Sequence, residues 1–200
     1  MAKQLGFYFD AGRCVECHGC EVACRSLHNV GAGIRWRRVW GRWYGEYPQP
    51  VNVYLSASCH HCEAPSCLNA CPVRAIVKRA EDGAVIVNRE ECIGCQACAD
   101  ACPYGVPQFG VDGRMEKCYL CVDRLAKGLE PACVATCPGE ALKVGELSAL
   151  IEQGAEKHGQ RLTGATRPSL VIVPASNPAG IKVDFHDFFS GNKKTLFHEE

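Results

Sequence analysis

The residues best suited to chemistry in this chain are its cysteines, which number 16 among 200 residues and gather in four runs of four. The third run is the most regular and reads Cys92-x2-Cys95-x2-Cys98-x3-Cys102-Pro103. Thiolate sulfur is a good ligand for soft metal ions, and short gaps between cysteines bring several sulfur atoms onto one centre. The spacing therefore predicts metal–sulfur ligation.

Each of the other three runs also ends with three residues between its last two cysteines. The first run comprises Cys14, Cys17, Cys20 and Cys24, the second Cys59, Cys62, Cys67 and Cys71, and the fourth Cys118, Cys121, Cys133 and Cys137. The second run has two extra residues in its loop, and the fourth has a gap of eleven. Proline follows the last cysteine in every run but the first. The four runs are thus variants of one pattern.

The pattern is that of [4Fe–4S] clusters in bacterial ferredoxins, where three cysteines of a run hold one cluster and the fourth holds another. The second and third runs are neighbours, so we expect them to exchange their last cysteines. The first and fourth runs must then do the same, by exclusion. The predicted ligand sets are site 1, Cys14, Cys17, Cys20 and Cys137; site 2, Cys59, Cys62, Cys67 and Cys102; site 3, Cys71, Cys92, Cys95 and Cys98; and site 4, Cys24, Cys118, Cys121 and Cys133.

Zinc and disulfides are the alternatives for so many cysteines. Zinc sites with four cysteines commonly use two separated pairs, whereas every run here adds a third cysteine and then a fourth three residues later. Disulfides between cysteines spaced this closely would be strained. Both alternatives are less consistent with the spacing than cubane clusters are.

Other polar residues near the cysteines predict no substrate chemistry. His18, His60 and His61 lie inside cysteine loops, where we expect exposed positions, although each could tune a cluster from outside its ligand shell. Tyr104 and Tyr119 are expected to shield clusters from water. The sequence shows no Ser–His–Asp set, paired carboxylates or phosphate loop, so we expect no catalytic site in the chain itself.

The remaining sequence predicts short elements around the cysteine runs. Strands are expected at residues 5–10, 51–57 and 141–144, a hairpin at 75–88, and one amphipathic helix within 146–158. A strand over residues 168–174 has proline at both ends, which favours an edge position or a docked segment. The tail from Ala175 is expected to be loop-like and to wrap a neighbouring protein or its own domain.

These elements predict an α+β fold of two nested bacterial-ferredoxin-like modules, in which short hairpins and helices surround four clusters. Residues 1–58 and 104–145 form the predicted outer module, and residues 59–103 the inner one. Residues 146–200 add a helix, a strand and a tail for docking.

Residues 34–50, IRWRRVWGRWYGEYPQP, combine aromatic and arginine side chains. Trp, Tyr and Arg are enriched where proteins bind one another, which makes Trp36, Trp40, Trp43 and Tyr44 candidates for partner binding. Packing on the core and stacking on nucleic-acid bases are the alternatives. The net charge of +0 gives no support for a nucleic-acid partner. We also expect neither a membrane span nor an export signal, since no long apolar stretch occurs and the N-terminal residues 1–14 contain no apolar signal region, twin-arginine pair or cleavage site.

The order of the runs, with the motifs CHHCEAPSC, CIGCQACADACPYG and KCYLCVDRLAKGLEPACVATCP, resembles the iron–sulfur subunits of the dimethyl sulfoxide reductase type. The resemblance covers roughly residues 5–175. It implies electron transfer through four [4Fe–4S] clusters, and a large catalytic subunit carrying bis-molybdopterin guanine dinucleotide with Mo or W. It also implies a membrane anchor subunit linked to quinone, or a soluble electron acceptor. By the family's pattern, site 1 lies nearest the molybdopterin.

The resemblance further implies a subunit held peripherally at the cytoplasmic membrane within a complex, on the cytoplasmic side unless it is exported with a signal-bearing partner. A free-standing polyferredoxin, which carries electrons between soluble enzymes, is the alternative function. A structural or maturation protein is less consistent with four complete cysteine sets. The sequence does not specify the substrate of the partner enzyme, the metal it uses or the direction of electron flow.

Overall fold

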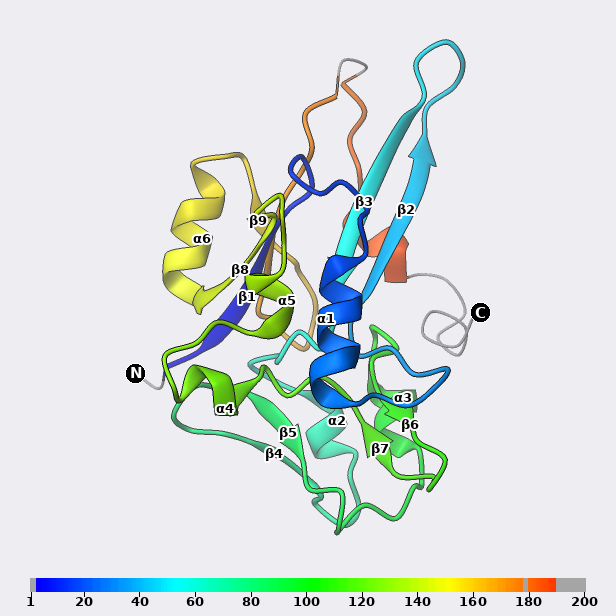
Figure 1. Ribbon diagram of the computed structural model, residues 1–200, viewed down its shortest axis with the longest axis vertical. Coiled ribbons are helices and arrows are strands. Elements are labelled where there is room, and N and C mark those ends of the chain that lie inside the picture. Colours follow the sequence, from blue (N-terminus) through cyan, green and yellow to red (C-terminus); the bar gives the residue numbers. More distant parts are fainter. Residues whose placement is uncertain (1–2, 178–179, 190–200) are drawn as a thin grey trace.

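Strand β1 (Leu5–Asp10) is the centre of the main sheet in the computed structural model, which describes residues 3–177 and 180–189 (Figure 1). It pairs antiparallel with β8 (Leu142–Glu146) and parallel with β10 (Leu170–Val173), and β9 (Gln160–Arg161) extends the sheet beyond β10. Because side chains alternate along a strand, Phe7 and Phe9 of β1 enter the main core, whereas Tyr8 joins a second core under α6 (Leu147–Ala155). The strand predicted at residues 5–10 and the helix predicted within 146–158 are confirmed.

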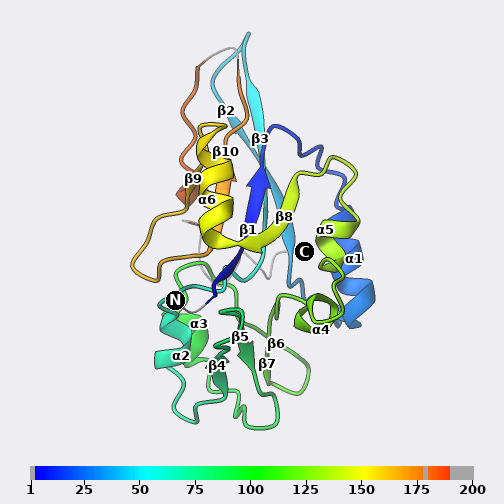
Figure 2. The ribbon, with the colours of Figure 1, turned by 90° about the vertical axis from the view of Figure 1, so that its left-hand side faces the viewer.

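The position of β10 differs from our expectation of an edge strand. The sheet order is β8-β1-β10-β9, so β10 is an inner strand, and all four of its residues are buried. Pro168 and Pro174 lie outside the strand, and they therefore remove no hydrogen-bond donor from its ladders. Strands β10 and β9 complete the sheet that β8 and β1 begin, and α6 packs against that sheet (Figure 2).

Strands β2 (Arg38–Tyr44) and β3 (Val51–Ala57) form a long antiparallel hairpin that rises above the main sheet in Figure 1. Its base is buried through Val39, Val53 and Leu55, whereas the outer half of β2 is exposed. The strand predicted at 51–57 is confirmed. Part of the aromatic segment is thus strand, paired with β3 over all of its seven residues.

A lower part of the molecule contains α2 (Ser66–Asn69), α3 (Ala97–Ala101) and two small hairpins. The hairpins are β4 (Ile76–Lys78) with β5 (Val85–Val87), as predicted, and β6 (Gln108–Phe109) with β7 (Met115–Glu116). Ile76, Val85, Cys98 and Met115 form its small core. Two cysteine-bearing helices, α1 (Gly19–His28) and α5 (Ala132–Ala135), lie on the side shown in Figure 2, together with α4 (Val122–Leu125), which follows Cys121.

Length and polarity of the helices are also informative. In residues 3–177 and 180–189, none of the helices has the length and apolar character needed to cross a bilayer.

The tail beyond Ala175 folds back onto its own chain. It ends, in the described residues, with the 3-10 helix η1 (Phe185–Phe189), in which all three phenylalanines are buried. Phe188 stacks on Phe185 with ring centroids 5.9 Å apart, and the Arg42 guanidinium of β2 lies 5.5 Å from the Phe188 ring. The part of the tail expected beyond residue 189 lies outside the described residues. The described part wraps its parent domain, one of the two expected arrangements.

Replacing Phe188 tests how firmly the tail is held. Phe188 is 1% exposed, so Phe188→Ala is expected to cost about 3 kcal/mol of stability, or a decrease of roughly 6–12 °C in the unfolding temperature. The matched control is Trp43→Ala, because Trp43 is 71% exposed and its loss should leave the unfolding temperature nearly unchanged. Anoxic thermal denaturation followed by circular dichroism measures both. An unchanged unfolding temperature in Phe188→Ala would contradict this packing.

Candidate metal centres

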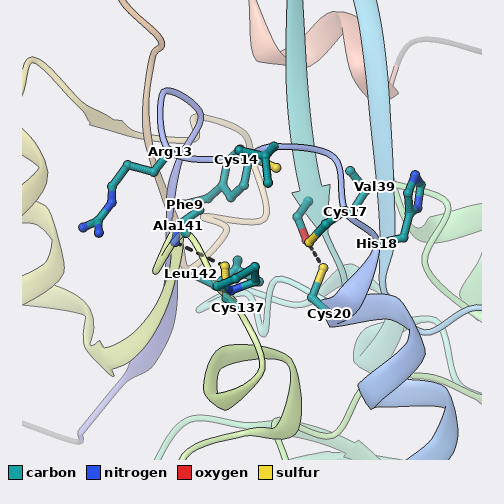
Figure 3. Close-up of a pocket in the computed structure, with 14 residues that line it drawn as sticks. Phe9, Arg13, Cys14, Cys17, His18, Cys20, Val39, Cys137, Ala141 and Leu142 are labelled. Atoms are coloured by element: carbon teal, nitrogen blue, oxygen red, sulfur yellow. Dashed lines mark hydrogen bonds between the residues drawn. The ribbon is translucent and has the colours of Figure 1, made fainter.

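Site 1 brings together cysteines from opposite ends of the chain (Figure 3). Cys14 and Cys17 lie in the loop after β1, Cys20 lies in the first turn of α1, and Cys137 follows α5. The four side chains line one cavity of about 350 Å³. Figure 3 shows their sulfur atoms around an open space, and the Ala141 N–H donates a hydrogen bond of 3.3 Å to Cys137 Sγ.

Site 4 lies about one helical turn further along the same face of α1. Cys24 of α1, Cys133 of α5, and Cys118 and Cys121 line a cavity of about 300 Å³. The Leu120 N–H donates to Cys118 Sγ at 3.4 Å, and His28 Nε2 lies 3.2 Å from Cys121 Sγ. The other nitrogen of His28 contacts the Tyr119 hydroxyl at 3.2 Å, so Tyr119 closes this side of the cavity as expected.

Site 2 is bordered by a histidine and a tyrosine. Cys59, Cys62, Cys67 and Cys102 line a cavity of about 370 Å³ together with His60 and Tyr104. Our expectation that the histidines of this loop are exposed is wrong: His60 is 3% exposed and its neighbour His61 is fully buried. The reason is that this loop lies between the main sheet and β5, where His61 Nδ1 accepts the Val85 N–H and Ser169 N–H donates to the His60 carbonyl. His18, by contrast, has a side chain that is 45% exposed, as expected.

Site 3 lies in the lower part of the molecule. Cys71, Cys92, Cys95 and Cys98 line a cavity of about 310 Å³, whose wall includes Met115. The Met115 N–H donates to Cys92 Sγ at 3.3 Å. Each of the four cavities therefore contains three cysteines of one run and the last cysteine of another run.

The loops achieve these arrangements through backbone conformations that side chains rarely adopt. His18, His61, Gln96 and Leu120 have φ values of 56°, 43°, 63° and 64°. Non-glycine residues with positive φ are uncommon and are often found at functional sites. One such residue lies between two cysteines of every run, where it turns the loop so that the sulfur atoms face one cavity.

Burial of the thiols shows what the cavities are suited to hold. Burial raises the pKa of Cys62, Cys67 and Cys118 to about 12, and that of Cys14 and Cys98 to about 11. Neighbouring cysteines of the same set raise it further, because their charges repel. Thiolates in these positions need a positively charged centre, which iron ions provide.

Within residues 3–177 and 180–189 no three Cys, His, Asp or Glu side chains are placed to hold a single metal ion.

Unpartnered polar atoms are a further sign that site 2 fits a cluster. Both ring nitrogens of His60 are buried without a hydrogen-bond partner among the described residues. Burial, with a contribution from the Arg37 charge, lowers the pKa of His60 to about 3, so the ring is neutral and carries one N–H. An N–H buried without an acceptor is costly, and cluster sulfur is a suitable acceptor in this cavity.

The four sites form a series in the order 1, 4, 2, 3. Helix α1 carries Cys20 of site 1 and Cys24 of site 4, and it packs against α5, which contains Cys133 of site 4 and is followed by Cys137 of site 1. Helices α2 and α3 link sites 2 and 3 in the same way. Sites 2 and 4 adjoin at the consecutive residues Lys117 and Cys118, of which Lys117 lines the site 2 cavity and Cys118 the site 4 cavity.

The four aromatic candidates for partner binding are placed differently from one another. Trp36 stacks on His28 with ring centroids 5.3 Å apart and donates from Nε1 to Glu116 at 3.1 Å. Trp40 packs edge-on against Phe189, and the Tyr44 hydroxyl is buried. These three side chains contact their own chain, whereas Trp43 is 71% exposed.

Two buried cations near the cysteines were not expected from the sequence. Arg37 and Lys117 are 2% and 3% exposed. Lys117 lines the site 2 cavity and donates to the carbonyls of Val85 and Cys118. Arg37 stands in a segment with several arginines, and nothing in the local sequence distinguishes it from Arg35. Only its long-range packing does so.

Comparisons with known proteins agree with this description of the sites. A family described as a 4Fe-4S dicluster domain matches residues 51–147, and a 4Fe-4S binding domain matches residues 11–31. The protein is 39% identical to a subunit of the anaerobic dimethyl sulfoxide reductase of Escherichia coli over 193 residues, or 88% of this chain and 92% of the relative. It is 36% identical to the formate dehydrogenase iron-sulfur subunit of Wolinella succinogenes, over 78% of this chain and 90% of the relative. It is also 46% identical to perchlorate reductase subunit beta of Dechloromonas aromatica, over 70% of this chain and 42% of the relative.

These matches cover most of the chain and include the regions of all four cysteine runs. The small sheets and few short helices around the cysteines agree with ferredoxin-like 4Fe-4S domains. The protein therefore belongs to the family of iron–sulfur electron-transfer subunits of molybdoenzyme complexes of the dimethyl sulfoxide reductase type.

Proposed function

We propose that this protein relays single electrons through four [4Fe–4S] clusters, one at each cysteine set, between a molybdopterin catalytic subunit and a second redox partner. The observation that carries the proposal is that all sixteen cysteines line four cavities in one continuous series. The clusters supply one-electron redox chemistry when bound. The protein holds them, excludes water and donates backbone N–H groups to cysteine sulfur, which are the means by which a protein sets cluster potentials.

The proposed ligation makes the fold two nested modules. The outer module holds sites 1 and 4 through α1 and α5, and the inner module holds sites 2 and 3 through α2 and α3. In each module the two helices pack together, and the cysteines in or directly after each helix serve both sites. The two modules meet at Lys117 and Cys118, which line the cavities of site 2 and site 4.

The two ends of the series are the proposed ports for electrons. Cys17 of site 1 and Cys95 of site 3 are exposed, whereas every cysteine of sites 4 and 2 is at least partly buried. Aliphatic side chains accompany both exposed cysteines: Val15 and Val22 are 67% and 66% exposed, and Ile93 is 64% exposed. Exposed apolar groups beside a redox centre suit docking to a partner that exchanges electrons there.

Site 1 is the proposed port to the catalytic subunit. The base of the β2–β3 hairpin lines this site through Val39 and Ser56, so the exposed hairpin extends the surface around it. Trp43 on the hairpin is a suitable anchor for a large stable interface. Relatives named as parts of dimethyl sulfoxide and perchlorate reductases support a catalytic partner, proposed to carry bis-molybdopterin guanine dinucleotide with Mo or W.

Site 3 is the proposed port to the second partner, either a quinone-linked membrane subunit or a soluble acceptor. With a membrane partner, the protein would lie peripherally at the cytoplasmic membrane, on the cytoplasmic side unless it is exported with a signal-bearing subunit. A free polyferredoxin is the alternative. It would use the same clusters, but it has less need for a long exposed hairpin beside one terminal site.

Anoxic purification from the native organism tests the partner. We expect the protein to co-purify in a fixed ratio with a large subunit that contains Mo or W and a molybdopterin. About 16 iron atoms are expected per copy of this chain, besides any in the partner. Recovery of the protein alone, with its iron and without Mo or W, would establish the polyferredoxin function instead.

Serine substitutions test the crossed ligation. We expect Cys137→Ser to alter or remove the same cluster signal as Cys14→Ser, because both cysteines line the site 1 cavity. Cys133→Ser, only four residues away, should affect a different signal, since Cys133 lines site 4. Electron paramagnetic resonance of the reduced proteins, together with iron analysis, separates these outcomes. If Cys137→Ser and Cys133→Ser affect the same signal, the crossed arrangement is wrong.

Charged substitutions at the two ends test the ports. Val22→Glu should weaken binding of the catalytic subunit by tenfold or more and leave the second partner unaffected, because it places a charge in an apolar contact. Ile93→Glu should have the reverse effect, so each variant controls for the other. Pull-down titrations measure binding, and iron content verifies that the clusters remain. A variant that weakens both partners equally, or neither, contradicts the assignment of ports.

A further inference from the structure

Arg37 occupies an unusual position for a charged residue. It is 2% exposed and lies directly before β2, at the level where the hairpin meets the main sheet. Its guanidinium donates to Ser58 Oγ at 2.9 Å, to Ser56 Oγ at 3.1 Å and to the Ser56 carbonyl at 3.3 Å. Its Cζ lies 4.6 Å from the centre of the Phe7 ring of β1. The side chain is therefore held in one orientation.

The charge of Arg37 has no carboxylate partner among the described residues. The ion pairs found there include nearby Arg35 with Glu21, but none involves Arg37. Burying an unpaired guanidinium is costly, so a structure that retains one needs a compensating negative charge. That charge must come from the groups around it.

The groups around Arg37 are cysteines of two different sites. Arg37 lines the cavity of site 4 together with Cys24, Cys118 and Cys133. The charges of these three cysteines and of Cys20 outweigh the effect of burial and raise the pKa of Arg37 above its ordinary value. Cys20 belongs to site 1, and the other three belong to site 4. Cys20 is also linked to Arg37 through Ser56, whose Oγ lies 3.4 Å from Cys20 Sγ. One guanidinium therefore faces both sites of the outer module.

We propose that Arg37 is a positioning residue for electron transfer, a fixed positive charge shared by sites 1 and 4 that raises the reduction potential of both clusters. The inference rests on the proposed function, because it requires clusters at these two sites. Reduction adds one negative charge to a cluster, and a buried cation nearby stabilises the reduced form more strongly than an exposed cation would. Arginine suits the task, because it stays protonated and its planar group can hold three hydrogen bonds at once.

Three substitutions separate charge from packing. Arg37→Met removes the charge and approximates the length of the side chain, and Arg37→Gln removes the charge but keeps a hydrogen-bond donor for the serines. Arg37→Lys keeps the charge. The matched control is Arg35→Met, because the Arg35 side chain is 40% exposed and pairs with Glu21. All four are prepared anoxically as the complex in which the protein is purified, with iron content measured first.

Redox titrations followed by electron paramagnetic resonance give the midpoint potentials. In Arg37→Met and Arg37→Gln we expect the midpoint potentials of sites 1 and 4 each to fall by about 59 mV or more. This shift corresponds to a tenfold change in the equilibrium constant for one-electron reduction. The potentials of sites 2 and 3 should stay unchanged. The signals lost in Cys14→Ser and Cys133→Ser identify sites 1 and 4. In Arg37→Lys both midpoint potentials should stay close to those of the unsubstituted protein, and Arg35→Met should change neither.

Several results would overturn the role of Arg37. Unchanged potentials in an uncharged variant with full iron content would show that the charge does not act on the clusters. If the midpoint potentials of sites 1 and 4 fall equally in Arg37→Lys and Arg37→Gln, the packing of the side chain, rather than its charge, sets these potentials. A decrease of similar size in Arg35→Met would remove the distinction between buried and exposed cations. If the unsubstituted protein has no cluster signals assignable to sites 1 and 4, the proposed function itself fails.

Discussion

The structure depends on the electrostatic cost of placing thiolates together out of water. Burial raises the pKa of most of these cysteines, for example to about 12 for Cys62 and Cys67, so the thiol form is favoured until a cationic centre is bound. The protein reduces this cost with backbone N–H groups that donate to sulfur and with the buried cations Arg37 and Lys117. Much of the fold serves to hold these groups at the cysteine loops.

Regular structure in this protein is correspondingly sparse and specialised. Helices α2, α4 and α5 have four residues each, too few to be stable alone, and the cysteines at or beside them anchor each one to a site. The main sheet is the exception, because β1 is covered on one face by α6 and on the other by the hairpin and the loops of site 1. That sheet supports site 1, whereas sites 2 and 3 are lined by residues of two small hairpins.

Burial also distinguishes the members of the series from one another. The inner positions, sites 4 and 2, are enclosed by aromatic groups such as Tyr119, Trp36, Tyr104 and Phe189, which exclude water. The terminal positions each keep one exposed cysteine and nearby aliphatic side chains. A protein that passes electrons from one end to the other needs this contrast, since electrons should leave only where a partner docks.

The amino-acid sequence alone determined the features that depend on local spacing. Gaps of two and three residues restrict which sulfur atoms can meet, and alternating apolar residues specify strands such as β1 and β3. Where neighbouring residues are of similar type, only the tertiary structure decided which of their side chains are buried. It placed β10 beside β1, buried His60, stacked Trp36 on His28, and buried Arg37 among several neighbouring arginines. These outcomes follow from contacts between segments far apart in the chain, and such contacts leave no periodic signal in the sequence.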